Sequence, residues 1–298
     1  MKILDLGSLN LDNVYHVDHI CQPGETLPSS LVENHLGGKG LNQSIACAKA
    51  GAKVLHAGKI GSDGDVLKEE LEKAGVDTRF LKKDNTIKNG HAIIQVDKNG
   101  QNSILLFAGS NFRITEADVD EALAACDPGD VLLLQNETTC VQYAIRAAHE
   151  KGIMVALNPS PMNDELASCD ELKYVDWFIL NEVEGFQISG KHDPDEICDA
   201  FLSRFPKTHI MLTLGNKGCI YRDADTRATH GIYDVKVVDT TAAGDTFTGY
   251  FLAGIVSGRP IEEVLETASK ASSIAVNTAG ASNSIPTLDQ VLKANLPE

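Results

Sequence analysis

A run of small residues leads into a carboxylate, Asp245, near the start of a predicted helix, and this is the strongest chemical signal in the sequence. The apolar residues 237–238 predict a strand before the run, and residues 246–256 predict the helix after it. Small side chains at a helix start leave backbone N–H groups accessible, so an anion can bind there to Ala242, Ala243, Gly244 and Asp245. Asp245 can then accept a proton from a hydroxyl that attacks a bound phosphate. The alternative is that Asp245 only caps the helix, as Asp commonly does.

A second signal is the glycine-rich segment at residues 37–40, which precedes a predicted helix over residues 42–50. Glycines let a ligand approach the backbone, and Lys39 and Asn42 offer hydrogen-bond donors to hydroxyl groups at the helix start. Taken alone, this pattern is more typical of a structural glycine turn.

A third signal is the end of a predicted strand, which contains Thr213 and ends at Leu214, followed by Gly215 and Gly218. Such a segment suits a nucleotide that packs against the chain, although by itself it is equally typical of a hairpin. The sequence contains neither G-x-x-x-x-G-K-[ST] nor G-x-G-x-x-G, which counts against a P-loop enzyme and a dinucleotide-dependent dehydrogenase.

The composition limits the classes of partner that the chain can have. Lys and Arg number 26 against 42 Asp and Glu, a net charge of −16 that repels nucleic acids and acidic membranes. The seven cysteines are scattered and form no C-x-x-C pair, so neither a zinc site nor a disulfide framework is expected. Asp5 comes too early for a secretory signal, and the longest apolar stretch, residues 250–256, is too short to cross a bilayer. We expect a soluble, cytoplasmic protein.

Apolar runs of strand length alternate with helical patterns along the chain, which predicts a mainly parallel sheet with helices on both faces. The predicted strands are residues 3–9, 54–60, 131–135, 154–158, 178–180 and 210–214, and the predicted helices include 66–74, 141–150, 261–276 and 288–296. Two segments break this rhythm: residues 13–33 contain no helical pattern, and residues 91–97 and 103–107 predict strands joined by an Asn99-Gly100 turn. We interpret them as a small β-sheet that forms a lid over the carboxyl ends of the parallel strands.

Together, in this order and spacing, the three motifs resemble the ribokinase family of PfkB-type carbohydrate kinases along essentially the whole chain. Residues 181–184 resemble the family's N-x-x-E motif, and residues 7–12 and 23–26 resemble its ribose-phosphorylating members. The resemblance implies one ribokinase-like domain over residues 1–298, a three-layer α/β/α fold, and lid segments at approximately residues 13–34 and 90–108. It also implies an ATP-dependent kinase that transfers the γ-phosphate to a primary hydroxyl of a small sugar, D-ribose above all, with Asp245 as the catalytic base.

The family resemblance also implies roles for particular residues. The residues expected to hold the sugar are Asn10, Asp12, Gly38, Lys39, Asn42, Glu137 and Asp245. Those expected to contact ATP are Asn181, Thr213, Gly215, Lys217, Gly218 and Gly244. Magnesium is expected to be held through water near Glu184, because it dehydrates reluctantly. An activating potassium ion would be bound by Asp239, Thr241, Ala275, Thr278, Gly280 and Ser284.

A lid sheet with open edges favours pairing of two lids, so we expect a homodimer, as the resemblance also implies. Three alternatives remain open at this point. The chain could be a kinase of the same fold for deoxyribose, fructose, a nucleoside or a sugar phosphate. It could be a catalytically silent sugar-binding protein, which would have no need of Asp245 beside an anion site. A nicotinamide oxidoreductase is disfavoured, because the dinucleotide fingerprint is missing.

Overall fold

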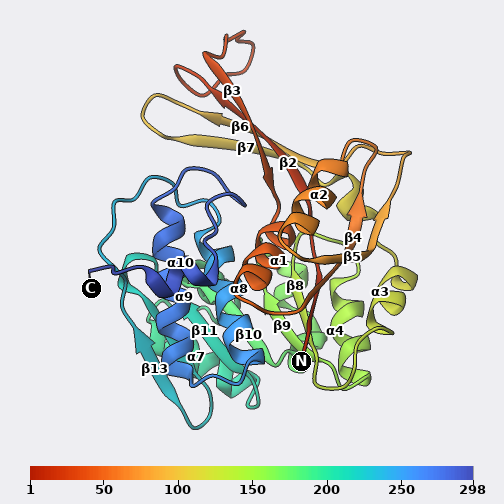
Figure 1. The fold of residues 1–298 in the computed structure, drawn as a ribbon, viewed down its shortest axis with the longest axis vertical. Helices are drawn as coiled ribbons and strands as arrows, with labels where there is room; N and C mark the ends of the chain where they lie inside the picture. The colour runs from red at the N-terminus through yellow and green to blue at the C-terminus, as the bar shows by residue number, and fades with distance from the viewer. Residues whose placement is uncertain (298) are drawn as a thin grey trace.

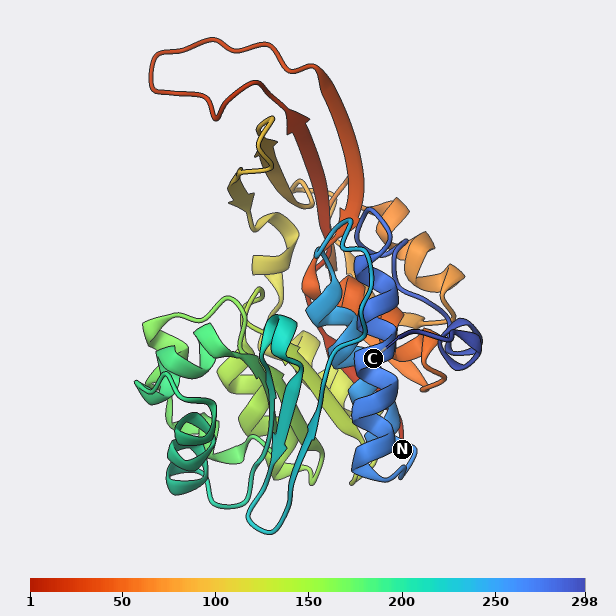
Figure 2. The ribbon, with the colours of Figure 1, turned by 90° about the vertical axis from the view of Figure 1, so that its left-hand side faces the viewer.

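The computed structural model describes residues 1–297 and has a large layered body from which a second sheet projects (Figures 1 and 2). In these residues the main sheet has nine strands in the order β13-β12-β11-β10-β9-β8-β1-β4-β5. The strands are β1 (Ile3–Leu6), β4 (Val54–Ile60), β5 (Asp77–Lys83), β8 (Val131–Gln135), β9 (Met154–Asn158), β10 (Trp177–Asn181), β11 (His209–Thr213), β12 (Cys219–Arg222) and β13 (Arg227–His230). Only the β11-β12 and β12-β13 pairs of this sheet are antiparallel in the described residues.

Helices cover both faces of the main sheet, because successive residues of its central strands bury their side chains on opposite sides. On β1, Ile3 joins one apolar cluster with Leu41 and Tyr250, whereas Leu4 joins the other with Ile145. The helices of the first face are α1 (Lys39–Lys49), α2 (Asp65–Lys73), α8 (Ala243–Val256), α9 (Ile261–Val276) and α10 (Leu288–Lys293). Those of the second are α3 (Glu116–Leu123), α4 (Val141–Glu150), α5 (Asp164–Ala167), α6 (Glu182–Ser189) and α7 (Pro194–Arg204). The predicted three-layer α/β/α fold is confirmed.

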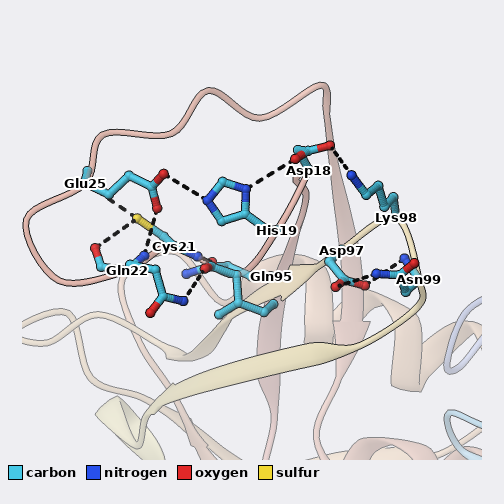
Figure 3. A network of polar contacts seen from close by, with 10 residues as sticks. Asp18, His19, Cys21, Gln22, Glu25, Gln95, Asp97, Lys98 and Asn99 are labelled. Carbon is cyan, nitrogen blue, oxygen red and sulfur yellow. Dashed lines mark hydrogen bonds and ion pairs between the residues drawn. The ribbon is translucent and has the colours of Figure 1, made fainter.

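The second sheet stands at one end of the body, as Figure 2 shows, and contains β3 (Leu31–Gly37), β2 (Asn10–His16), β6 (Gly90–Val96) and β7 (Asn102–Phe107) in that order. Its two loops meet at the tip, where the Lys98 ammonium lies 2.9 Å from an oxygen of Asp18 (Figure 3). His19 contacts both Asp18 and Glu25. The Lys98–Asp18 pair joins the two loops, whereas the His19 contacts lie within the first loop, and such exposed pairs contribute little stability.

One edge of this small sheet is apolar. Along β7, Ile104, Leu105, Leu106 and Phe107 are all exposed, and Leu105 is 68% exposed. Four adjacent exposed apolar residues on an edge strand are unusual for a surface that stays in water.

The structure corrects four of the predicted strands and helices. The first strand ends at Leu6 rather than at residue 9, because the Leu9 N–H donates to the Asn111 side chain and β2 starts at Asn10. The helices α1 and α8 begin three residues earlier than predicted, at Lys39 and Ala243. The strand predicted at residues 237–238 does not form, because the Val238 N–H donates to the Val276 carbonyl at the end of α9.

No helix within residues 1–297 is both long enough and apolar enough to cross a bilayer.

Candidate active site

Asp245 lies in the first turn of α8, where its side chain is buried between two amides of α1. Its Oδ2 accepts a hydrogen bond from Asn42 Nδ2 at 2.9 Å, and its Oδ1 accepts one from Gln43 Nε2 at 2.8 Å. The two helices approach closely, since a Cβ on Gly249 would lie 2.3 Å from the Ala46 Cβ. The carboxylate is therefore held in one orientation at the helix start.

The start of α8 offers room for an anion. Ala242, the N-cap residue, has a left-handed φ of 60°, a conformation that non-glycine residues adopt at a cost and that recurs at functional sites. The Ala243 N–H donates to the Thr240 carbonyl, whereas the following first-turn N–H groups have no partner within a regular helix. A Cβ on Gly244 would meet no described atom within 4 Å. A ligand can thus reach the backbone at Gly244 directly.

A pair of carboxylates, Glu137 and Asp12, lies near the start of α1, close enough for their charges to interact. Glu137 follows β8, and its Oε2 accepts from Ser8 Oγ at 2.5 Å and from the Lys39 N–H at 3.2 Å. A Cβ on Gly37 would lie only 2.1 Å from Asp12 Oδ2, so a side chain there would displace the Asp12 carboxylate. Burial, and then the charge of Glu137, raise the pKa of Asp12 to about 6, against the opposing effect of His35. Two partly desolvated acceptors suit a ligand with several hydroxyl groups.

The glycine-rich segment brings α1 directly onto the end of β1. Gly38 is the N-cap of α1 with a φ of 94°, and a Cβ on Gly40 would lie 2.5 Å from the backbone of Gly7. Burial lowers the pKa of Lys39, but the charges of Asp245, Glu137 and Glu184 outweigh it and raise that pKa above its usual value. Lys39 is therefore a cation that faces the carboxylates of this site.

A cavity of about 370 Å³ opens on the other side of α8, a size that suits a small-molecule ligand. Of the residues expected to contact ATP, it is lined by Thr213, Gly215, Gly218 and Gly244. Asn181 and Lys217 lie outside this lining: Asn181 pairs with Thr213 across β10-β11, and the exposed Lys217 forms an ion pair with Glu182. The predicted hairpin is also present, because β11 pairs with β12. The hairpin and the ligand interpretation of this segment are compatible.

Much of the cavity wall was missed by the sequence analysis. The segment before α8 contributes Ile232, Val235 and Val237, and α9 contributes Ser272 and Ser273. The segment has no regular secondary structure, so no helix or strand period marks it. The sequence signal was composition, because Ile232, Val235 and Val237 are apolar residues in a stretch without a helical or strand period. The structure shows Ile232 and Val237 to be exposed.

Asn181 and Glu184 form a capping box at the start of α6. The Glu184 N–H donates to Asn181 Oδ1 at 2.9 Å, and the Asn181 N–H donates to Glu184 Oε2 at 3.0 Å. Glu184 is buried, with only 6% of its surface exposed. One of its two oxygens therefore serves the helix, and its other oxygen is the one left for a ligand.

The residues expected to bind potassium come from two segments that lie together. Asp239 accepts from the Thr241 N–H at 2.8 Å and from the Gly280 N–H at 2.9 Å, which ties the segment before α8 to the loop after α9. Ser284 Oγ is buried and donates to the Ala281 carbonyl. Ala275 and Thr278 lie at the end of α9, where the Thr278 N–H donates to the Ala275 carbonyl. The atoms that these residues would offer to the ion are side-chain and backbone carbonyl oxygens, which suit a hard cation.

Three polar residues that support the site were not predicted from the sequence. Asn111 donates from Nδ2 to Asn10 Oδ1 at 2.8 Å. Buried Gln43 donates to Asp245 and accepts from buried Gln135. A signal existed for Gln135, since it is a polar residue at the end of an otherwise apolar strand. Gln43 gave no separate signal in the sequence, because it directly follows Asn42 in the same motif.

A mainly parallel sheet with an open helix start, a buried carboxylate and an adjoining cavity is an arrangement that an α/β phosphotransferase can use. The sequence profile of the pfkB family of carbohydrate kinases matches residues 2–288, and the chain belongs to that family. It is thus an ATP-dependent carbohydrate kinase by family.

Individual relatives agree with this family. The chain is 36% identical to a ribokinase of Haemophilus influenzae, with 97% of this chain and 96% of the relative covered. It is 32% identical to a deoxyribokinase of Salmonella typhi, with 97% of each covered. The structure of Arabidopsis thaliana ribokinase complexed with ribose and ATP matches with a TM-score of 0.88 at 28% identity, over 98% of this chain and 97% of that one.

Proposed function

We propose that the chain phosphorylates D-ribose at its primary hydroxyl to give ribose 5-phosphate. The observation that carries the proposal is the Asp245 carboxylate, buried between Asn42 and Gln43 at a helix start. The Arabidopsis relative holds ribose and ATP on the same fold. The deoxyribokinase relative supports the second candidate, a kinase for deoxyribose.

In the proposed reaction, Asp12 and Glu137 accept hydrogen bonds from the ring hydroxyls, and Asn10, Gly38 and Lys39 complete the sugar site. Asn42 acts through Asp245, which it holds by a hydrogen bond. Asp245 accepts the proton of the primary hydroxyl as that oxygen attacks the γ-phosphorus. The N–H groups at Ala242 to Asp245 stabilise the negative charge on the transferred group. ADP leaves along the cavity beside Gly244.

Filling the space at Gly244 tests the nucleotide assignment. We expect Gly244→Val to raise the KM for ATP by at least about tenfold, because its side chain would project into open space beside the cavity rather than into the core. The KM for the sugar should change much less. Gly129→Ala, at an open position with a φ of 90° remote from the cavity, controls for general destabilisation. An unchanged KM for ATP in Gly244→Val would refute this assignment.

Magnesium, bound through water near Glu184, would neutralise charge on the phosphates of ATP. We also propose that a potassium ion binds at Asp239 and the loop after α9 and orders the start of α8. Replacing potassium by sodium should lower kcat several-fold, and Asp239→Ala should make the rate insensitive to that exchange. Equal wild-type rates in potassium and in sodium would contradict the proposed potassium site.

We further propose that two copies pair through their small sheets and cover the exposed β7 residues. Sedimentation should then give twice the chain mass of 32.0 kDa. Leu105→Asp would place a charge in the contact and should shift the protein to a monomer. A monomeric wild-type protein at micromolar concentration would contradict the pairing.

The proposed function is tested by ADP release with ribose, deoxyribose, fructose, adenosine and fructose phosphate, in magnesium and potassium. We expect the highest kcat/KM with ribose. A higher value for another member of the panel would retain the kinase and change its substrate. Sugar binding without ADP release would favour a silent binding protein.

A further inference from the structure

A second carboxylate, Asp5, is buried in the centre of the main sheet and has no part in the proposed reaction. It lies on β1, between β4 and β8, and its side chain is 0% exposed. Its Oδ1 accepts from Gln135 Nε2 at 3.1 Å, and its Oδ2 accepts from Ser44 Oγ at 2.8 Å. A buried acid in a strand interior is costly, so its contacts call for an explanation.

A chain of hydrogen bonds links Asp5 to Asp245. Gln135 Nε2 donates to Asp5 Oδ1 and also to Gln43 Oε1 at 2.9 Å. Gln43 Nε2 in turn donates to Asp245 Oδ1 at 2.8 Å and to Asn158 Oδ1 at 3.0 Å. Both ends of this chain are carboxyl oxygens that accept hydrogen bonds. If either amide turned over, its oxygen would face another acceptor, so the amides have one favourable orientation.

We propose that Asp5 is a positioning residue for Asp245, acting through the side chains of Gln135 and Gln43. The acceptor at Asp5 fixes the amide of Gln135, and Gln135 then supplies the donor that fixes the amide of Gln43. Gln43 presents its N–H to the Asp245 carboxylate for that reason. This inference rests on the proposed role of Asp245 as the base.

The acceptor at Asp5 Oδ1 persists whether or not Asp5 carries a proton. Burial raises the pKa of Asp5 to about 7, opposed by the hydrogen bonds from Gln135 and Ser44 and reinforced by the charge of Asp245. The other titratable groups that face it are Cys47 on α1 and His56 on β4, and burial lowers the pKa of His56 to about 4. Ser44 Oγ has one proton but lies 2.8 Å from both Asp5 Oδ2 and His56 Nδ1. Two hydrogen bonds therefore join these three groups, so either Asp5 Oδ2 or His56 Nδ1 must carry a proton in addition to that of Ser44. In both cases Asp5 Oδ1 carries no proton and can accept from Gln135.

This geometry provides a matched pair of variants. Asparagine at position 5 can accept from Gln135 and donate to Ser44, as the protonated acid does, whereas leucine of similar size can do neither. We expect Asp5→Leu to lower kcat at least tenfold with the KM for ATP within about twofold of wild type. Asp5→Asn should restore kcat to within about threefold. A folded Asp5→Leu with wild-type kcat, or an Asp5→Asn as slow as Asp5→Leu, would overturn the proposal.

If Asp5→Leu does not fold, Gln135→Met removes the hydrogen bonds that link Asp5 to Gln43, with little change of side-chain volume. It should show the same loss of kcat, and a wild-type kcat would again overturn the proposal. The variants are compared on whichever sugar the wild-type protein phosphorylates best. If the ribose assignment is wrong, the wild-type protein will prefer another sugar. If the inference about Asp5 is wrong, the Asp5 and Gln135 variants will not differ from wild type in kcat as predicted.

Thermal unfolding gives a readout that does not depend on activity. Because the pKa of Asp5 is raised from about 4 when unfolded to about 7 when folded, wild-type stability from this group is lost as pH rises through that range. Asp5→Asn has no such loss, so its Tm should exceed that of wild type more at pH 8 than at pH 5. A Tm difference that is the same at both pH values would show that the pKa of Asp5 is not raised in the folded protein, whereas the kcat values of the Asp5 and Gln135 variants decide the positioning role.

Discussion

Asp245→Asn is expected to lower kcat by about 10²–10⁴-fold, the range attributed to a positioned general base. The amide is almost the same size as the carboxylate but cannot accept the hydroxyl proton. Folding should survive, because Asn42 Oδ1 is buried without a hydrogen-bond partner among the described residues and can accept from the new amide if the Asn42 side chain turns over. The measurement is single-turnover phosphoryl transfer at saturating ATP and sugar.

A matched control separates catalysis from helix capping. Asp289 is also an acidic residue in the first turn of a helix, α10, but it is exposed and paired with Lys293. If Asp245 acted only on the helix, Asp289→Asn and Asp245→Asn would both cost a few tenths of a kcal/mol to about 1 kcal/mol of stability and neither would lose turnover. A near-normal kcat in Asp245→Asn would show that Asp245 is not the catalytic base.

Asp12→Ala is expected to lower kcat/KM for the sugar by about 100-fold, with the KM for ATP unchanged. The side chain is a partly desolvated acceptor, and a hydroxyl that loses a charged acceptor in such a site loses about 1.5–3 kcal/mol of binding. Asp18→Ala, on the exposed tip of the same sheet, should behave as wild type. Equal effects of the two variants would indicate damage to the sheet rather than loss of a sugar contact.

The same residue predicts a pH dependence. Since the pKa of Asp12 is raised to about 6, its carboxylate is ionised at pH 8 and becomes protonated as pH falls below about 6. The wild-type kcat/KM for the sugar should therefore decline below pH 6, and Asp12→Asn should lose that decline. A flat wild-type profile between pH 8 and pH 5 would show that the ionised form is not needed.

The layered fold was predictable because apolar periodicity reports directly on which faces are buried. The strands β4, β8 and β9 were predicted with their observed bounds. β5 was not predicted, because its sequence, residues 77–83, carries four charged side chains that mask its alternation. Nor could the early starts of α1 and α8 be read from the sequence, since they depend on the left-handed conformations of Gly38 and Ala242.

The candidate site was predictable where a residue belongs to a local motif. Asp245 and Lys39 stand in such motifs, whereas Gln43, Gln135 and Asn111 act through partners far away in the sequence. The irregular segment that lines the cavity was missed for the same reason, because only the folded chain brings it against Gly244. Local patterns thus identify individual groups, and the network between them requires the three-dimensional structure.

Phosphorus NMR of the protein with ATP, magnesium, potassium and ribose tests the central claim most directly. We predict ADP and one new phosphate monoester whose signal is split by two protons, as expected for phosphate on the CH₂ of the primary hydroxyl. The same signal should grow at least about 10²-fold more slowly with Asp245→Asn. A monoester coupled to a single proton would place the phosphate on a secondary hydroxyl. That result, or release of inorganic phosphate alone, would contradict the account.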